Sequence, residues 1–232
     1  MSCSVKEPAD TCCTPSMGLF VLTQQWYPQL GPEEEFTMHG LWPDTCDGGM
    51  GPKDGCDPAR HYDDLGSILQ QADAKLYDEM NTYWPSYKGD NPAFWSHEWN
   101  KHGTCVSTLE PKCLGSDAPQ HQDAVQYFRM ALSLRRQFNT FAALSKAGIV
   151  PGRQYEREQF AAALSDAWGV PVELHCAQGQ LEEVRLWMKV RGRDQFVAVP
   201  PLSSGGGGGN NGGSCGRMIG YPSKKKKERS DK

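Results

Sequence analysis

Two short segments of the chain concentrate side chains that could do proton or metal chemistry. Residues 38–46 read MHGLWPDTC, and residues 94–105 read FWSHEWNKHGTC. Together they hold three of the six histidines, and tryptophans flank them. A metal site, an acid–base site and a purely structural polar cluster are three possible interpretations. The side chains concerned are His39, His97, Glu98, Lys101 and His102.

The spacing of the histidines in the second segment fits a metal site poorly. In the zinc helix motif the two histidines are four residues apart and share one face. His97 and His102 are five apart, which separates them by about 140° around a helix. If residues 94–102 are helical, His97 lies one turn from Lys101, and Glu98 lies one turn from His102. The pattern predicts one broad polar face rather than a metal centre.

Such a face suits an anionic group, for example a phosphodiester. Lys101 can neutralise charge on the non-bridging oxygens, where preorganised cations act most strongly. Imidazoles exchange protons near neutral or mildly acid pH. In-line displacement needs groups on opposite sides of the phosphorus, and His39 comes from a separate segment. A single histidine beside tryptophans is often structural, but burying this whole polar set without a function would be costly. The residues alone do not assign acid and base.

The charge distribution limits the class of protein. The net charge is −4, and the last nine residues carry six basic and two acidic side chains, so the rest of the chain carries −8. An acidic body argues against a protein that coats nucleic acid through a basic stripe, but it allows a nuclease with a local cationic pocket. No apolar run is long enough to span a membrane, so no membrane partner is expected.

Hydrophobic patterning predicts an α+β fold. Strands are expected over 18–28, 170–176 and 181–199, the last with a turn inside it. Helices are expected over 65–80, 121–137 and 157–168, with Gly169 as the C-terminal cap of the third. Strands and helices do not alternate regularly, which favours an antiparallel sheet packed with several helices. We expect a single catalytic domain over residues 1–222, with an irregular loop over 44–61.

Two segments read as unstructured. Residues 205–213, GGGGGNNGG, predict a flexible loop or linker. A phosphate-cradling loop would need a strand before it, a helix after it and a Lys-Ser/Thr pair, and none of these is present. Residues 223–232 predict a solvated, disordered basic tail rather than an RNA-binding arm.

The nine cysteines contain no CxxC pair, which disfavours a zinc finger or a thioredoxin-like site. Spread through a chain of this size, they indicate disulfides and therefore an oxidising compartment. Nothing at the start of the chain reads as a signal peptide.

The two segments resemble the active-site segments of the ribonuclease T2 family, and most closely its fungal branch. The resemblance extends through CTPSMGLFVLTQQW, TYWPS, KHGTCVSTLEPKC and KVRGRDQFVAV. It implies a secreted or vacuolar/lysosomal, monomeric endoribonuclease that cleaves single-stranded RNA, and not DNA, with little base preference. Cleavage would be a metal-independent and cofactor-free transphosphorylation through a 2′,3′-cyclic phosphate, which is then hydrolysed to a 3′-phosphate. The rival class is a non-catalytic storage or toxin-like protein on the same fold, and such relatives usually lack one catalytic histidine.

Carried over by motif, the resemblance implies a role for each polar residue. His102 would be the general base on the 2′-OH, and His39 the general acid on the leaving 5′-oxygen. Glu98 and Lys101 would stabilise the transition state, and His97 would bind phosphate.

The resemblance also implies where the bases bind. The upstream base would stack on Trp42 and hydrogen-bond to Asp44. Met50 would form the second wall of this pocket, where fungal relatives tend to carry an aromatic residue. The downstream base would meet Gln25, Pro85, Ser86 and Phe94.

The family pattern implies four disulfides and leaves Cys13 unpaired. A bond between Cys13 and the adjacent Cys12 is disfavoured by disulfide geometry. Either the partner of Cys13 lay in a trimmed N-terminal segment, or this lineage lost the bridge. The implied pairs are Cys3–Cys46, Cys12–Cys113, Cys56–Cys105 and Cys176–Cys215.

Overall fold

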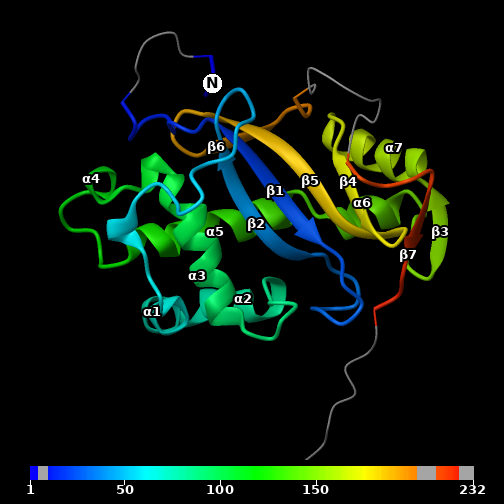
Figure 1. The fold of residues 1–232 in the computed structure, drawn as a ribbon, viewed down its shortest axis with the longest axis horizontal. Helices are drawn as coiled ribbons and strands as arrows, with labels where there is room; N and C mark the ends of the chain where they lie inside the picture. The colour runs from blue at the N-terminus through cyan, green and yellow to red at the C-terminus, as the bar shows by residue number, and fades with distance from the viewer. Residues whose placement is uncertain (5–9, 203–212, 225–232) are drawn as a thin grey trace, which may run out of the picture.

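The computed structural model describes residues 1–4, 10–202 and 213–224, and these form a sheet flanked by helices (Figure 1). The α+β class predicted from the sequence is confirmed. The strands are β1 (Leu19–Gln25), β2 (Thr37–Asp44), β3 (Arg153–Glu156), β4 (Glu173–Ala177), β5 (Gln180–Arg191), β6 (Gln195–Ala198) and β7 (Met218–Tyr221). The α-helices are α1 (Leu65–Ala72), α2 (Ala74–Tyr83), α3 (Asn91–Lys101), α4 (Pro111–Leu114), α5 (Gln122–Gln137), α6 (Thr140–Lys146) and α7 (Arg157–Trp168).

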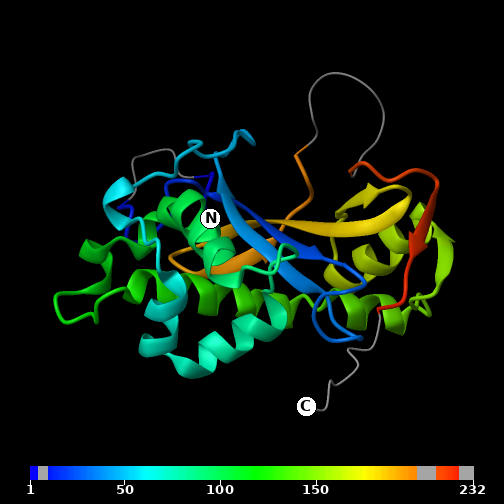
Figure 2. The same ribbon diagram turned by 60° about the horizontal axis from the view of Figure 1, so that its bottom comes forward.

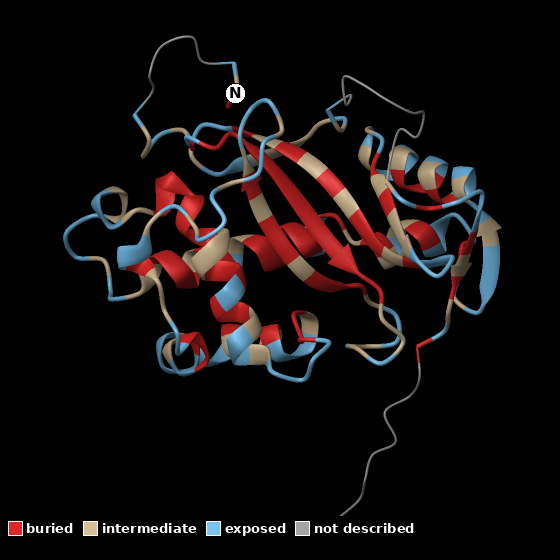
Figure 3. Ribbon diagram, viewed as in Figure 1, coloured by how far each residue is buried: buried red, intermediate tan, exposed pale blue. Residues whose placement is uncertain are grey.

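The sheet has the strand order β2-β1-β5-β7-β3, and β4 and β6 also pair with β5. Its pairings are antiparallel except for the short contact between β5 and β7, which is parallel. β1 is buried along its whole length, whereas burial alternates along β5 (Figure 3). The alternation places Arg185 and Trp187 on the half-exposed face of the sheet, because side chains in a strand point to opposite faces in turn.

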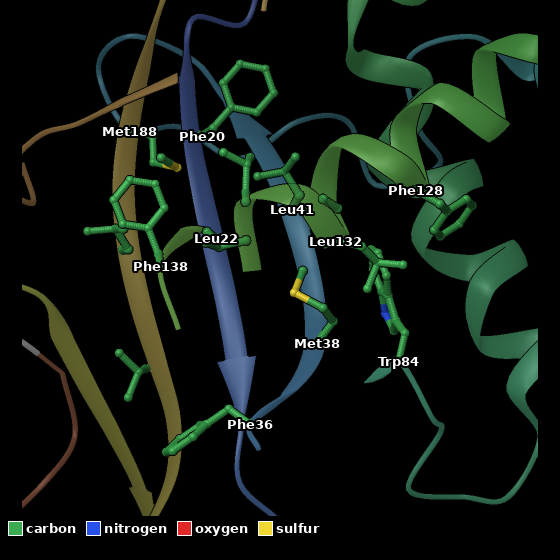
Figure 4. Packing of buried hydrophobic residues seen from close by; sticks show 14 of the residues in the cluster. Phe20, Leu22, Phe36, Met38, Leu41, Trp84, Phe128, Leu132, Phe138 and Met188 are labelled. Atoms are coloured by element: carbon green, nitrogen blue, oxygen red, sulfur yellow. The ribbon is translucent and has the colours of Figure 1, made fainter. Parts of the chain in front are cut away.

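Helix α5 covers the opposite face of the sheet (Figure 2). Its apolar stripe at Val125, Phe128 and Leu132 is buried, as the periodicity predicts. Figure 4 shows Leu132 in one cluster with Leu22 of β1 and Leu41 of β2. This packed layer fixes β1 and β2, and therefore fixes the strand that carries His39.

The expected helix over 65–80 is two helices. Asp73 ends α1, and its side chain accepts a hydrogen bond from the backbone N–H of Leu76 at 3.1 Å, so it caps α2. Aspartate is a favoured N-cap residue because its carboxylate satisfies one of the free N–H groups of the first turn. The sequence patterns did not predict helices α4 and α6 or strands β2, β3 and β7.

Four disulfides cross-link the chain, and their pairing is the one that the resemblance implies. Cys13 is exposed and is the free cysteine of the described residues. Most of the predicted Gly-rich loop or linker, residues 205–212, lies outside the described residues. Its last member, Gly213, adopts φ +105° and lies so close to Leu174 that an added Cβ would be 2.0 Å from that carbonyl oxygen.

The described part of the chain continues past residue 222 to Lys224. The Lys224 side chain is buried, and its ammonium donates to the carbonyl oxygens of Leu30 and Glu35 at 2.6 Å each. It lies over the ring of Trp26, 4.4 Å from the centroid. The rest of the predicted tail, 225–232, lies outside the described residues. No helix in the described part of the chain has the length and apolar character needed to cross a membrane.

Candidate active site

Strand β2 and helix α3 bring the two histidine segments together (Figure 1). His39 and Trp42 lie on β2, and their rings are 5.0 Å apart between centroids. Trp42 also stacks on His102, with 5.4 Å between centroids. The indole of Trp42 therefore contacts both imidazoles.

Helix α3 forms where the sequence gives it a clear start and end. Asp90 accepts a hydrogen bond from the backbone N–H of Ala93 at 3.0 Å and caps the N-terminus. The helix ends at Lys101, and His102 follows as its C-cap. The next residue, Gly103, lies against Trp99, where an added Cβ would be 2.3 Å from the ring. This close packing turns the chain directly after His102.

Glu98 is the most deeply buried member of the predicted set, with 1% of its surface exposed. Its carboxylate accepts a hydrogen bond from Trp42 Nε1 at 2.9 Å. A Cβ at Gly40 would be 2.3 Å from that carboxylate, so only glycine permits this approach of α3 to β2. Burial raises the pKa of Glu98 to about 7, although His39, the bond from Trp42 and Lys101 act in the opposite direction.

His39 is held by a carboxylate that sequence reasoning missed. Its Nδ1 lies 2.5 Å from Oε1 of Glu183 on β5, and the guanidinium of Arg185 donates to the other oxygen of Glu183 at 3.0 and 2.7 Å. Burial disfavours charge on His39, but the bond to Glu183 and the charges of Glu98 and Glu183 outweigh it and raise its pKa. Burial also opposes charge on Glu183, yet His39 and Arg185 lower the pKa of Glu183 to about 2.

His102 has the opposite environment. Burial, followed by the positive charges of Lys101, His97 and His39, lowers the pKa of His102 to about 3. Burial and the charge of Lys101 also lower the pKa of His97. At mildly acid pH, His102 is therefore neutral while His39 is protonated. Among the residues that the structure describes, no group of three or more His, Cys, Asp or Glu side chains is placed to hold a metal ion.

A cavity of about 490 Å³ opens beside His39, and we call it the His39 cavity. Of the residues predicted to bind the downstream base, Ser86 and Phe94 line it, and the Phe94 ring lies 5.8 Å from that of His39. Gln25 and Pro85 are buried and do not line it, and Gln25 donates to the carbonyl oxygen of Met38 at 3.0 Å. Tyr87 and Lys88, which the sequence analysis did not single out, complete one wall.

The predicted upstream pocket lies at the end of β2. Trp42 and Asp44 are half-buried, and Met50 pairs with Asp44 in an isolated antiparallel bridge. Met50 is 85% exposed, so it stands opposite Asp44 without being packed against the core. Burial raises the pKa of Asp44 to about 6. Arg185 lies over the Trp42 ring, 5.3 Å from its centroid.

Comparison with known proteins identifies the family to which this chain belongs. The family model described as Ribonuclease T2 family matches residues 10–199. Ribonuclease Rh of Rhizopus niveus is 43% identical over 97% of this chain and 90% of its own length. Ribonuclease T2 of Aspergillus oryzae is 39% identical over 79% of this chain and 68% of its own length. The crystal structure of Actibind, a T2 ribonuclease, superposes with a TM-score of 0.86 at 34% identity, and the match covers 96% of this chain and 94% of Actibind. The chain belongs to the ribonuclease T2 family.

Proposed function

We propose that this protein is an endoribonuclease that cleaves single-stranded RNA with little base preference, through a 2′,3′-cyclic phosphate. The observation that carries the proposal is the pair of histidines that both contact Trp42, one with a raised pKa and one with a pKa lowered to about 3. Two titratable groups whose environments push their pKa values apart are the mark of an acid and a base.

In the first step the neutral His102 takes the proton of the RNA 2′-OH. The 2′-oxygen attacks the adjacent phosphorus, and the bond from phosphorus to the 5′-oxygen breaks. The leaving 5′-oxygen receives the proton of the His39 imidazolium, whose Nδ1 is held by Glu183, so that Nε2 faces the reaction. The products are a 2′,3′-cyclic phosphate and a free 5′-OH. Hydrolysis to a 3′-phosphate follows, with the two histidines exchanging roles.

The remaining polar groups stabilise the negative charge that develops on the phosphorus oxygens. Lys101 supplies a fixed cation, and His97 supplies an N–H donor at the wall of the His39 cavity. Because the pKa of Glu98 is raised to about 7, this side chain is a neutral acid at mildly acid pH. It can then donate a hydrogen bond to a phosphoryl oxygen rather than repel it.

Stacking on aromatic rings accounts for weak base preference, since every base has a π-face. Trp42 would take the upstream base, with Asp44 at its edge and Met50 as an exposed second wall. Phe94 and Ser86 would take the downstream base in the His39 cavity.

Four disulfides support passage through an oxidising compartment, and we propose a secreted or vacuolar/lysosomal monomer. The rival function, a non-catalytic storage or toxin-like protein, is not favoured because both His39 and His102 are present with complementary environments.

The decisive experiment compares RNA with DNA, each with and without EDTA. RNA should be cut equally in both conditions, with a cyclic phosphate as the first product. DNA should not be cut, because it lacks the 2′-OH nucleophile. EDTA-sensitive cleavage, or cleavage of DNA, would contradict the proposed mechanism.

A further inference from the structure

A second cavity of about 400 Å³ lies beside the C-terminal half of α3, one turn beyond Phe94, and we call it the Lys53 cavity. One wall is a face of α3 and carries His97, Asn100 and Lys101 at positions i, i+3 and i+4. The facing wall comes from the 45–61 loop. His97 also lines the His39 cavity, so the two cavities meet at this side chain. The loop wall supplies Lys53, Asp54 and His61.

The loop is fixed against α3 rather than resting loosely on it. Gly55, at φ +80°, approaches so closely that an added Cβ would be 2.0 Å from the carbonyl oxygen of Asn100. The Cys56–Cys105 disulfide ties the loop to the segment after α3, and the backbone N–H of Cys56 donates to Thr104 Oγ1 at 3.1 Å. The cavity is therefore a built feature with rigid walls.

The polar groups of this cavity have unused hydrogen-bonding and charge capacity. Neither Lys53 nor Lys101 forms a salt bridge with a described residue. The Nε2 atom of His61 is buried and has no hydrogen-bond partner among the described residues. Asn100 accepts from the backbone N–H of Tyr62 at 2.8 Å through Oδ1, and its amide NH₂ donates to no described residue. Buried polar atoms are rarely left unpaired, so such an atom needs an explanation.

The charge of the cavity favours an anion. Two lysines face one aspartate there, in a chain whose net charge is −4. The histidines and the Asn100 amide add N–H donors, which are the groups that phosphate oxygens accept from. The position of the cavity also favours a ligand on the upstream side of the RNA. The predicted downstream base site lies on the other side of His97. The 45–61 loop, in contrast, leads directly from the predicted upstream pocket at Asp44 and Met50.

We propose that the Lys53 cavity is a second phosphate subsite, which holds the phosphate on the 5′ side of the upstream nucleotide. This inference rests on the proposed ribonuclease function and adds a subsite to it. An RNA chain would then be held at two consecutive phosphates, with His97 between them. Lys53 supplies the cation that belongs to this subsite alone.

The test compares the dinucleotide ApA with pApA, which carries the additional 5′-phosphate, and with ApAp, which carries a 3′-phosphate instead. The wild-type protein should cleave pApA with a kcat/KM about five-fold above that for ApA, the upper end for one exposed ion pair. Lys53→Gln should remove this advantage and leave ApA cleavage unchanged. Lys75→Gln, which changes an exposed lysine of α2, should keep it. On a longer oligonucleotide, Lys53→Gln should reduce the salt slope of log kcat/KM by about 0.7.

Equal rates for ApA and pApA in the wild type, survival of the advantage in Lys53→Gln, or an advantage only for ApAp would each overturn the inference. Binding of 2′-fluoro analogues, which lack the nucleophile, separates this failure from failure of the proposed function. If pApA and ApA are not cleaved but the 5′-phosphorylated analogue binds more tightly in a Lys53-dependent way, the catalytic proposal fails and the subsite stands. If the analogues bind equally, the subsite fails whatever the activity.

Discussion

The sheet side and the helix side of the active site present the same side chain in opposite electrostatic surroundings. On the sheet side, His39 is hydrogen-bonded to the ionised carboxylate of Glu183, and its pKa is raised. On the helix side, His102 is buried beside cations, chiefly Lys101, and its pKa falls to about 3. The two imidazoles contact the same tryptophan ring, yet their protonation states differ across the mildly acid range.

The difference in pKa between His39 and His102 supports the proposed roles of acid and base without reference to their positions in the sequence. A general base must be unprotonated and a general acid protonated at the same pH. The environment of His102 satisfies the first condition, and that of His39 satisfies the second. The arrangement favours activity at mildly acid pH, between the low pKa of His102 and the raised pKa of His39.

The largest expected effect comes from removing either histidine. His39→Ala and His102→Ala should each lower kcat by ~10²–10⁴-fold, because each removes one proton-transfer partner. The measurement is steady-state cleavage of a dinucleotide, with thermal unfolding to check the fold. His121→Asn is the matched control, since His121 adopts a left-handed φ of 61° that asparagine tolerates and does not line the His39 cavity. Wild-type kcat in either alanine variant would remove that residue from the mechanism.

Glu183→Gln tests the sheet side alone. Loss of the carboxylate lowers the pKa of His39, because burial then opposes its charge without the hydrogen bond to Glu183, so the acid loses its proton at lower pH. The alkaline limb of the kcat/KM profile should therefore move to lower pH, while the acid limb, set by His102, stays in place. At the optimum we expect a loss of roughly 10–100-fold, as for other carboxylates that orient a functional histidine.

The neighbouring Glu182→Gln is the control for this experiment, because Glu182 accepts from the Tyr27 hydroxyl rather than from His39. Its profile should keep both limbs. A Glu183→Gln profile with an unmoved alkaline limb would show that Glu183 does not set the charge of His39.

The smallest expected effect is at the upstream pocket, which lies outside the protonation contrast. Met50→Tyr places a rigid ring opposite Asp44, at the predicted upstream pocket, where the flexible thioether now stands 85% exposed. We expect a change of a few-fold, on the order of the ~0.5–1.5 kcal/mol of an aromatic pair, in the preference among dinucleoside phosphates, with both pH limbs unchanged. An unaltered preference ratio would indicate that Met50 does not contact the upstream base.

The helix side of the site could be predicted from the sequence because it is local. His97, Glu98 and Lys101 lie on one helix, and their one-turn spacing needs no tertiary information. The apolar stripe of α5 could be predicted for the same reason. The need for groups on opposite sides of the phosphorus pointed to His39 as the partner, and the family resemblance then added the assignment of acid and base.

The sheet side could not be predicted because it depends on strand register. Glu183 lies 144 positions from His39 in the chain, and only the pairing of β5 with β1 and of β1 with β2 brings them together. A signal was available: Glu183, Arg185 and Trp187 alternate with buried residues and so share one face of a strand. That alternation shows which side chains share a face of the strand, but it does not show which other strand brings a histidine next to them.

Two further features could not be predicted because the local sequence is typical of a different structure. β2 contains Gly40 and Pro43, which are rare in central strands, but β2 is an edge strand and tolerates proline. Lys224 reads as part of a basic tail, and its burial depends on acceptors at Leu30 and Glu35 that are distant in sequence.

The most direct test of the contrast is an NMR titration of the two imidazoles in the wild-type protein, with resonances assigned from the His39→Ala and His102→Ala variants. We predict that His102 stays neutral down to about pH 3, whereas His39 remains protonated above the pH at which an ordinary histidine loses its proton. If His102 gains its proton at a higher pH than His39 does, the proposed base and acid are reversed and the account is contradicted.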